Sequence, residues 1–139
     1  MHLDGARLLN ALLYTGDDIK TFSKSFNTIS FCFSKGMGCP IGSVLLGTAE
    51  DMQFAKSIRK MLGGGTRQTG ILAACMQVSL EDWEEKLLID NENCKYFGEQ
   101  LNSSIEGVSC DMTYVHTNML NFTLDPEITN NEKKSLQHN

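Results

Sequence analysis

The sequence of 139 residues predicts an α/β fold, because short apolar runs typical of strands alternate with segments of helical period. The run 28–34 is aromatic and β-branched and leads into a glycine-rich stretch, which predicts a buried strand followed by a loop. A second short buried strand is predicted at 43–47. We expect these strands and a short one around Leu3 to form one parallel sheet. Asp4 is then expected at the end of the strand next to that at 28–34, so that Asp4 and Lys35 point into one cavity.

Two short helices are predicted before the strand at 28–34. Leucines fall at helical spacing between residues 7 and 14, and Gly16 is placed to stop that helix. Asp17 is then expected to cap a second short helix, in which Ile19, Phe22 and Phe26 keep the apolar period.

A second pair of helices is predicted after the strand at 43–47. The segment 48–51 resembles a capping box and opens a helix with Phe54, Ile58 and Met61 on one face, which the glycines at 63–65 end. Thr66 is expected to cap the next helix, which is apolar nearly all round from 71 to 80 and is therefore predicted to be buried.

The second half of the chain predicts part of another domain. A long helix with an apolar stripe is expected from residue 81, followed by two antiparallel strands at 108–112 and 119–124, which Pro126 ends. We therefore divide the chain into residues 1–82 of an α/β domain, residues 83–125 as a linker helix with a partial α+β domain, and residues 126–139 as a frayed polar tail.

Composition excludes several classes of function. The net charge of −5 and the isoelectric point near 5.1 argue against general binding to nucleic acid or to anionic membranes. Five irregularly spaced cysteines indicate reduced thiols, and hence a cytoplasmic protein, instead of a disulfide framework or a zinc site. Because no apolar run approaches the roughly 20 residues of a membrane span, we expect a soluble protein with no membrane partner.

Lys35 is the residue that most needs a chemical explanation. A lysine at the carboxyl end of an α/β strand lies where such folds bind ligands, and partial desolvation there would favour the neutral, nucleophilic amine. A surface lysine that closes a strand is the simpler alternative. Asp4 and Arg7, three residues apart, suit either a site or a helix cap. Four basic residues flank the three glycines in a stretch free of acids, which suits either an anion site or a solvated basic face: Lys56, Arg59, Lys60 and Arg67.

Three long motifs occur in a fixed order. They are HLDGARLLNA at residues 2–11, SFCFSKGMGCPIGS at 30–43 and RKMLGGGTRQ at 59–68. Together they resemble the low-specificity threonine aldolases, and the resemblance runs from the first residue to about Leu124. It implies a pyridoxal-phosphate enzyme of the aspartate-aminotransferase type (fold type I), with a large α/β domain, a small α+β domain and a homotetrameric assembly.

The resemblance also implies roles for individual residues. Lys35 matches the lysine that holds the cofactor covalently, beside Ser34, and Asp4 matches the aspartate that keeps the pyridine nitrogen protonated. Arg7 matches an arginine that contacts the cofactor and the substrate carboxylate. Lys60, as a substrate contact, and Arg67, as a cofactor contact, match basic residues that reach an active site across a subunit interface. The implied reaction cleaves a β-hydroxy-α-amino acid, threonine or allo-threonine, to glycine and an aldehyde.

The resemblance covers only the middle of a family member, so two kinds of function stay open. The chain is either part of a threonine aldolase or a non-catalytic fragment that interacts with intact subunits. Another lyase of the same superfamily, such as an aromatic amino-acid β-eliminating lyase, is the enzymatic alternative. For the isolated chain we expect exposed strand edges and apolar faces, including the helix from 68 to 80, weak cofactor binding and no threonine cleavage.

Overall fold

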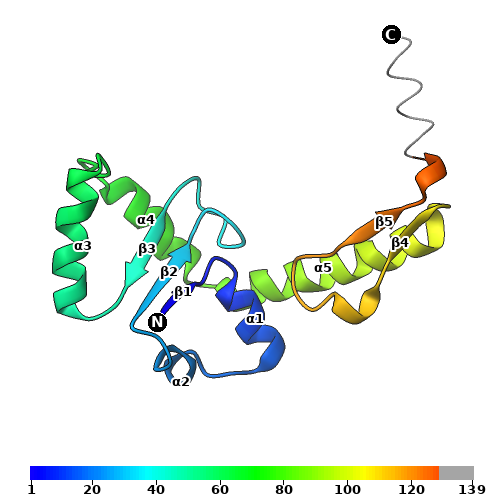
Figure 1. Cartoon of the computed structure of the whole chain (residues 1–139), viewed down its shortest axis with the longest axis horizontal. Helices are drawn as coiled ribbons and strands as arrows, with labels where there is room; N and C mark the ends of the chain where they lie inside the picture. Colours follow the sequence, from blue (N-terminus) through cyan, green and yellow to red (C-terminus); the bar gives the residue numbers. More distant parts are fainter. Residues whose placement is uncertain (129–139) are drawn as a thin grey trace, which may run out of the picture. The chain divides into compact units, whose positions relative to one another are not determined.

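The computed structural model describes residues 1–128, and its described part forms two compact units (Figure 1). The first unit is Met1–Leu88 and the second begins at Ile89. The division falls inside the long helix α5 (Trp83–Ser104). The predicted tail at 126–139 lies almost entirely outside the described residues.

The first unit contains a three-stranded sheet in the order β1-β2-β3, with β1 at His2–Asp4, β2 at Thr28–Cys32 and β3 at Ser43–Leu46. β1 runs parallel to β2, with Asp4 opposite Ser30. β3 runs antiparallel to β2, so the prediction of an all-parallel sheet is wrong for β3. The connection at 33–42 contains no helix, and a parallel return needs a crossover of a dozen or more residues, so the chain turns directly back.

β3 is also less buried than predicted. Leu45 and Leu46 are 43% and 52% exposed, and only Val44 packs against the core. β3 is an edge strand in the described part of the chain, because only β2 pairs with it. An edge strand that is not covered on both faces keeps large apolar side chains in contact with solvent.

Two helices precede β2. α1 (Leu8–Thr15) ends as predicted at Gly16, whose φ of 72° lets its N–H donate to the carbonyl of Leu12 at 2.8 Å. α2 (Ile19–Ser23) is capped by Asp18, which accepts from the N–H of Thr21 at 2.8 Å, so the predicted cap at Asp17 is wrong by one residue. The side chain directly before the first helical residue is the one that reaches the free N–H groups of the first turn. Phe26 lies beyond the end of the helix.

Two further helices follow β3. α3 (Ala49–Met61) is capped by Thr48 as predicted, since its hydroxyl accepts from the N–H of Asp51 at 3.2 Å, and Gly63 with φ 83° lies just beyond the helix end. α4 (Gly70–Ser79) begins after Thr69, whose side chain makes no capping bond, and not after Thr66.

The apolar faces of α3 and α4 are largely exposed. Ser79 is the only buried residue of α4, so the prediction of a buried helix is wrong, and the exposure expected for the isolated chain is confirmed. A sheet of three short strands has too little area to cover two more helices. In the segment from α3 to α4, the large apolar side chains most in contact with solvent are Phe54, Met61, Leu62, Ile71 and Val78.

The core of the first unit lies between α1, β2 and the loop after β2. It consists of Leu9, Leu12, Phe31, Phe33, Met37, Cys39 and Leu87. The rings of Phe31 and Phe33 meet edge to face at 5.0 Å, a favourable geometry for an aromatic pair. The loop after Lys35 is therefore part of the core and is held by its burial.

The second unit packs a two-stranded antiparallel sheet, β4 (Val108–Cys110) with β5 (Phe122–Leu124), against its part of α5. The antiparallel pairing was predicted, but Met112 opens the 3₁₀ helix η1 (Met112–Tyr114) and is not part of the strand. The amide of Asn102 on α5 donates to the carbonyl of Cys110 at 2.8 Å and accepts from its N–H at 2.7 Å. No helix among residues 1–128 is long and apolar enough to cross a membrane.

Candidate functional site

The parallel pairing of β1 with β2 brings two of the predicted site residues to one edge of the sheet. Asp4 is the last residue of β1, and Lys35 follows the end of β2 at Cys32 in the next loop. Because parallel strands end at the same edge, both residues leave the sheet on the side where α/β folds bind ligands. This backbone placement agrees with the sequence prediction.

Gly5 allows β1 to end close against β2. Its N–H donates to the carbonyl of Ser30 at 2.8 Å, and a Cβ placed on it would lie 2.7 Å from that same oxygen. Only glycine fits so near a neighbouring backbone. The Asp4 carboxylate bends toward the next turn, where Oδ1 accepts from the N–H of Ala6 at 3.1 Å. Within residues 1–128 its Oδ2 has no hydrogen bond, so that atom is available to a ligand.

The loop that carries Lys35 is a tight turn. The N–H of Gly38 donates to the carbonyl of Lys35 at 2.8 Å, and the φ of 72° at Gly38 is one that glycine adopts without strain. The N–H of Cys39 donates to the carbonyl of Phe33 at 3.0 Å, which closes the base of the turn. Ser34 and Lys35 are both exposed. Residues 1–128 therefore do not shield the Lys35 side chain from water in the way that the sequence had led us to expect. The Lys35 amine makes no hydrogen bond or ion pair within the described chain.

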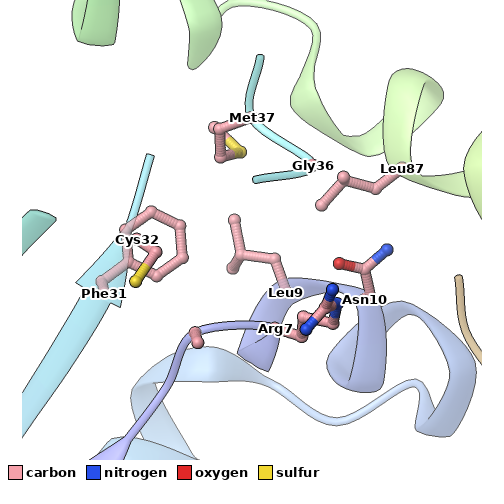
Figure 2. A pocket seen from close by; sticks show the side chains of 9 residues that line it. Arg7, Leu9, Asn10, Phe31, Cys32, Gly36, Met37 and Leu87 are labelled. Carbon is pink, nitrogen blue, oxygen red and sulfur yellow. The ribbon is translucent and has the colours of Figure 1, made fainter. Parts of the chain in front are cut away.

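Arg7 lies at the start of α1, beside a small cavity between that helix and the lysine loop (Figure 2). The cavity measures about 10 Å³, roughly the space of one water molecule. Its lining residues come from the start of α1, the end of β2, the lysine loop and α5: Ala6, Arg7, Leu9, Asn10, Phe31, Cys32, Gly36, Met37 and Leu87. Asp4 and Lys35 were predicted to point into one cavity, but this cavity is lined by their neighbours Arg7 and Gly36 and not by them.

Lys60 and Arg67 lie on either side of the glycine loop after α3, and both are exposed. The loop packs closely on the end of the helix, since a Cβ on Gly64 would lie 3.0 Å from Cγ of Arg59 and 3.2 Å from its carbonyl oxygen. Gln68 has φ 58°, an uncommon value for a residue with a side chain, just before α4 begins. No hydrogen bond or ion pair in the described residues joins either basic side chain to the Asp4 edge of the sheet.

Two further residues, His2 and Cys39, have side-chain pairing or packing roles. His2 Nδ1 lies 2.8 Å from Oγ1 of Thr28, across the β1–β2 pair. Cys39 is buried in the core, as expected of a packing residue. All five cysteines are free thiols, and no group of three potential metal ligands occurs among residues 1–128.

Asn10 is the residue that sequence reasoning missed. It is 3% exposed, it lies one helical turn after Arg7, and it lines the small cavity (Figure 2). The sequence holds a signal for it, because Asn10 is a polar residue beside Leu9 on the apolar face of α1. A buried amide at such a position is retained only where hydrogen bonds compensate for its loss of water.

The side chains at this edge suit pyridoxal phosphate. Lys35 offers a free primary amine, Asp4 a carboxylate with an unoccupied oxygen, and Arg7 an exposed guanidinium at a helix start. An amine can bond to the cofactor's aldehyde, a carboxylate can pair with a protonated ring nitrogen, and a guanidinium can bind a carboxylate in a bidentate manner. The residues present therefore fit that cofactor.

Comparisons with known proteins agree with this chemistry. The family described as beta-eliminating lyase matches residues 1–125. Low-specificity L-threonine aldolase 1 of Arabidopsis thaliana is 39% identical over 86% of this chain and 33% of its own length. The low specificity L-threonine aldolase of Saccharomyces cerevisiae is 36% identical over the whole chain and 36% of its own length.

Solved structures extend the comparison to the fold. A putative L-allo-threonine aldolase from Listeria monocytogenes superimposes with a TM-score of 0.77 at 26% identity, over 87% of this chain and 33% of its own. A putative aromatic amino acid beta-eliminating lyase/threonine aldolase from Exiguobacterium superimposes with a TM-score of 0.76 at 28% identity, over 89% of this chain and 35% of its own. The chain thus spans about a third of the length of the relatives it matches. With nearly its whole length matched by the family and its fold shared with these structures, the chain belongs to the beta-eliminating lyase family, within which its homologues include low-specificity threonine aldolases.

Proposed function

We propose that this chain supplies the cofactor-holding edge of a pyridoxal-phosphate-dependent aldehyde-lyase that cleaves L-threonine or L-allo-threonine to glycine and acetaldehyde. The names of its relatives support this substrate class. The structural observation that carries the proposal is the parallel pairing of β1 with β2, which puts Asp4 and the Lys35 loop at the same edge.

Each residue at this edge has a definite task. Lys35 holds the cofactor through its amine, and the exposed hydroxyl of Ser34 lies next to it in the chain. Asp4 would hold a proton on the ring nitrogen by accepting a hydrogen bond at Oδ2. Such a charge-assisted hydrogen bond is worth about 1.5–3 kcal/mol. Arg7 orients the substrate carboxylate. When bound, pyridoxal phosphate supplies the electron sink for the electron pair left on Cα when the Cα–Cβ bond breaks.

Lys60 and Arg67 are proposed to act on the active site of a second subunit in a homotetramer. Both are exposed beside a close-packed glycine loop, and no acid lies between residues 52 and 80 to neutralise them. A basic surface of this kind suits a cofactor phosphate or a substrate carboxylate. We place the enzyme in the cytoplasm, in threonine breakdown and glycine formation, which its five free thiols support.

β-Elimination is a second candidate activity, favoured by the description of the matched family. It would use the same residues while the Cα proton is removed and a substituent leaves Cβ, and hydrolysis of the resulting enamine by water would give a 2-oxo acid and ammonia in place of glycine and an aldehyde. A non-catalytic role as an interaction partner is the third, favoured by the exposed apolar side chains of α3 and α4. Product analysis separates the first two, and an absence of any turnover supports the third.

The first experiment treats the 139-residue chain with excess pyridoxal phosphate, reduces covalent adducts with borohydride and maps them by mass spectrometry. Lys35 should be labelled in preference to Lys24, another exposed lysine of the same unit. Lys35→Ala should remove that label and leave the Lys24 label unchanged. Equal labelling of the two lysines in the wild type would refute the proposed role of Lys35.

The second experiment measures turnover in a full-length background. Residues 1–125 replace the matching segment of the Escherichia coli low specificity L-threonine aldolase, which is 38% identical over 120 residues. Threonine should yield equal amounts of glycine and acetaldehyde. Asp4→Ala should keep cofactor bound while most cleavage is lost, because Asp4 acts on the electronics of the ring. Unchanged cleavage in that variant would count against its role.

A further inference from the structure

The loop at 33–42 that carries Lys35 is closed by its own backbone. The N–H of Phe33 donates to the carbonyl of Gly42 at 3.0 Å, and the N–H of Cys39 donates to the carbonyl of Phe33 at 3.0 Å. Phe33 lies two residues before Lys35, so Gly42 is tied directly to the stretch that positions the lysine. Whatever holds Gly42 in place therefore also restrains Lys35.

A side chain of α4 packs on this closing residue. A Cβ placed on Gly42 would lie 2.1 Å from Cε of Met76 and 3.9 Å from its Sδ. The methyl group of Met76 thus occupies the space where a side chain at position 42 would begin, which puts it in van der Waals contact with the loop backbone. Met76 is partly buried and also packs against the core that includes Phe33 and Met37.

This contact also matters for the position of α4 itself. Most residues of α4 are exposed, and among the described residues its apolar side chains that pack against the core are Cys75 and Met76. Methionine is unbranched and flexible, so it fits an irregular gap such as the one beside a glycine backbone. Met76 is therefore a point at which α4 and the lysine loop hold each other.

We propose that Met76 is a positioning residue for the site: by packing on Gly42 it holds the closing end of the lysine loop against α4, and so fixes the Lys35 amine at the edge of the sheet. The roles described above do not use this side chain. α4 begins at Gly70, three residues after Arg67, so the same helix joins the lysine loop to the segment proposed to reach a second subunit. The link to the chemistry of Lys35 rests on the proposed function, whereas the packing of Met76 on the loop does not.

Two measurements on the 139-residue chain test this role. The first is the ratio in which pyridoxal phosphate and borohydride label Lys35 and Lys24. The second is hydrogen exchange, resolved at single residues, of the three N–H groups that form the internal hydrogen bonds of the loop, those of Phe33, Gly38 and Cys39.

Three variants separate this contact from general packing. Met76→Ala removes both atoms that approach Gly42, whereas Met76→Leu reaches about as far as Sδ and has no atom in place of Cε. Leu13→Ala is the matched control, because Leu13 is a partly buried side chain of α1 that packs against the same core. It truncates a side chain of similar size at a position outside the loop and outside α4.

In Met76→Ala we expect exchange at the three loop N–H groups to accelerate by roughly tenfold or more, with a smaller increase in Met76→Leu. The Gly5 N–H, which bonds to β2 outside the loop, should change little. Labelling of Lys35 relative to Lys24 should fall by roughly tenfold to a hundredfold in Met76→Ala, because a displacement of about 1 Å can cost about 10²-fold. The control variant should lower the urea midpoint without a selective effect on the loop or on the labelling ratio.

Three outcomes would overturn the inference. The first is unchanged exchange at the loop N–H groups in both Met76 variants, and if Met76→Ala does not fold, unchanged exchange in Met76→Leu is sufficient. The second is a loss of protection that is equal in Met76→Ala and Leu13→Ala and equal at the loop and at Gly5. The third is a loosened loop with an unchanged labelling ratio, because Met76 then does not position Lys35. If the loop loosens but wild-type Lys35 is not labelled in preference to Lys24, the packing role of Met76 stands and the proposed function fails.

Discussion

Gly5→Ala should separate the two strands that carry the candidate site. A Cβ at this position would lie 2.7 Å from the carbonyl oxygen of Ser30 and 3.1 Å from Cγ2 of Ile29, and real Cβ atoms essentially never come within 3.0 Å of another heavy atom. The first of these contacts is backbone, so it cannot be relieved by rotating a side chain. The end of β1 must therefore move away from β2, which also weakens the 2.8 Å hydrogen bond from the Gly5 N–H.

The size of the effect follows from the cost of overpacking. Such insertions typically destabilise a protein by about 1–3 kcal/mol, which corresponds to a decrease of roughly 5- to 150-fold in the folding equilibrium constant. With a urea dependence of about 1–3 kcal/mol per molar, the midpoint of unfolding should fall by the order of 1 M. Because Asp4 moves with the strand end, selective labelling of Lys35 by pyridoxal phosphate and borohydride should fall as well.

Gly70→Ala is the matched control for this substitution. Gly70 is the first residue of α4, and a Cβ there meets nothing within 4 Å. Alanine is a better helix former than glycine by up to about 1 kcal/mol, so the control should be neutral or slightly stabilising. Equal urea midpoints for Gly5→Ala and Gly70→Ala would refute the close approach of β1 to β2.

Three further predictions concern other parts of the molecule. A hydrogen bond from Thr21 lowers the pKa of Asp18 below its ordinary value of 3.8. Asp18→Ala should therefore lower the urea midpoint at pH 7, where the charged cap contributes to stability. The difference from wild type should disappear as the pH falls below 3.8 through the lowered pKa, because the cap is then protonated. Asn102→Ala should cost about 1–3 kcal/mol in thermal or urea unfolding, because both backbone groups of Cys110 lose their partner, while Asn93→Ala on the exposed side of α5 should be neutral. The 139-residue chain should self-associate in sedimentation experiments, because Phe54, Met61, Leu62 and Ile71 are 71–79% exposed. It should also bind pyridoxal phosphate weakly and cleave no threonine. Robust turnover by a monomer would contradict this expectation.

The local signals of the sequence predicted the ends of helices well. Gly16 ends α1 and Thr48 begins α3, because each feature depends on a few neighbouring residues. The cap of α2 was assigned to Asp17 and not to Asp18, because two adjacent aspartates give the same signal in the sequence. Only the backbone conformation decides which of them reaches the N–H of Thr21.

Long-range features were harder to predict. The antiparallel direction of β3 depends on how the loop at 33–42 turns. The four apolar and polar residues of the strand itself do not indicate whether it pairs parallel or antiparallel with β2. The exposure of α4 depends on which elements cover it, and composition alone indicated a buried helix. The position of Asp4 and Lys35 at one sheet edge was predictable because it follows from a general property of parallel strands.

The two strand pairings also differ in the length of chain that each must close. β2 meets β3 across 11 residues, from Cys32 to Ser43, whereas β1 meets β2 across 26, from His2 to Thr28. The shorter loop costs less entropy to close, so the β2–β3 hairpin that carries the lysine should form early in folding. β1 is expected to join later and to detach before β3, because it pairs with β2 over three residues whereas β3 pairs over four. The lysine turn is therefore expected to form before Asp4, its carboxylate partner at the site, is in place.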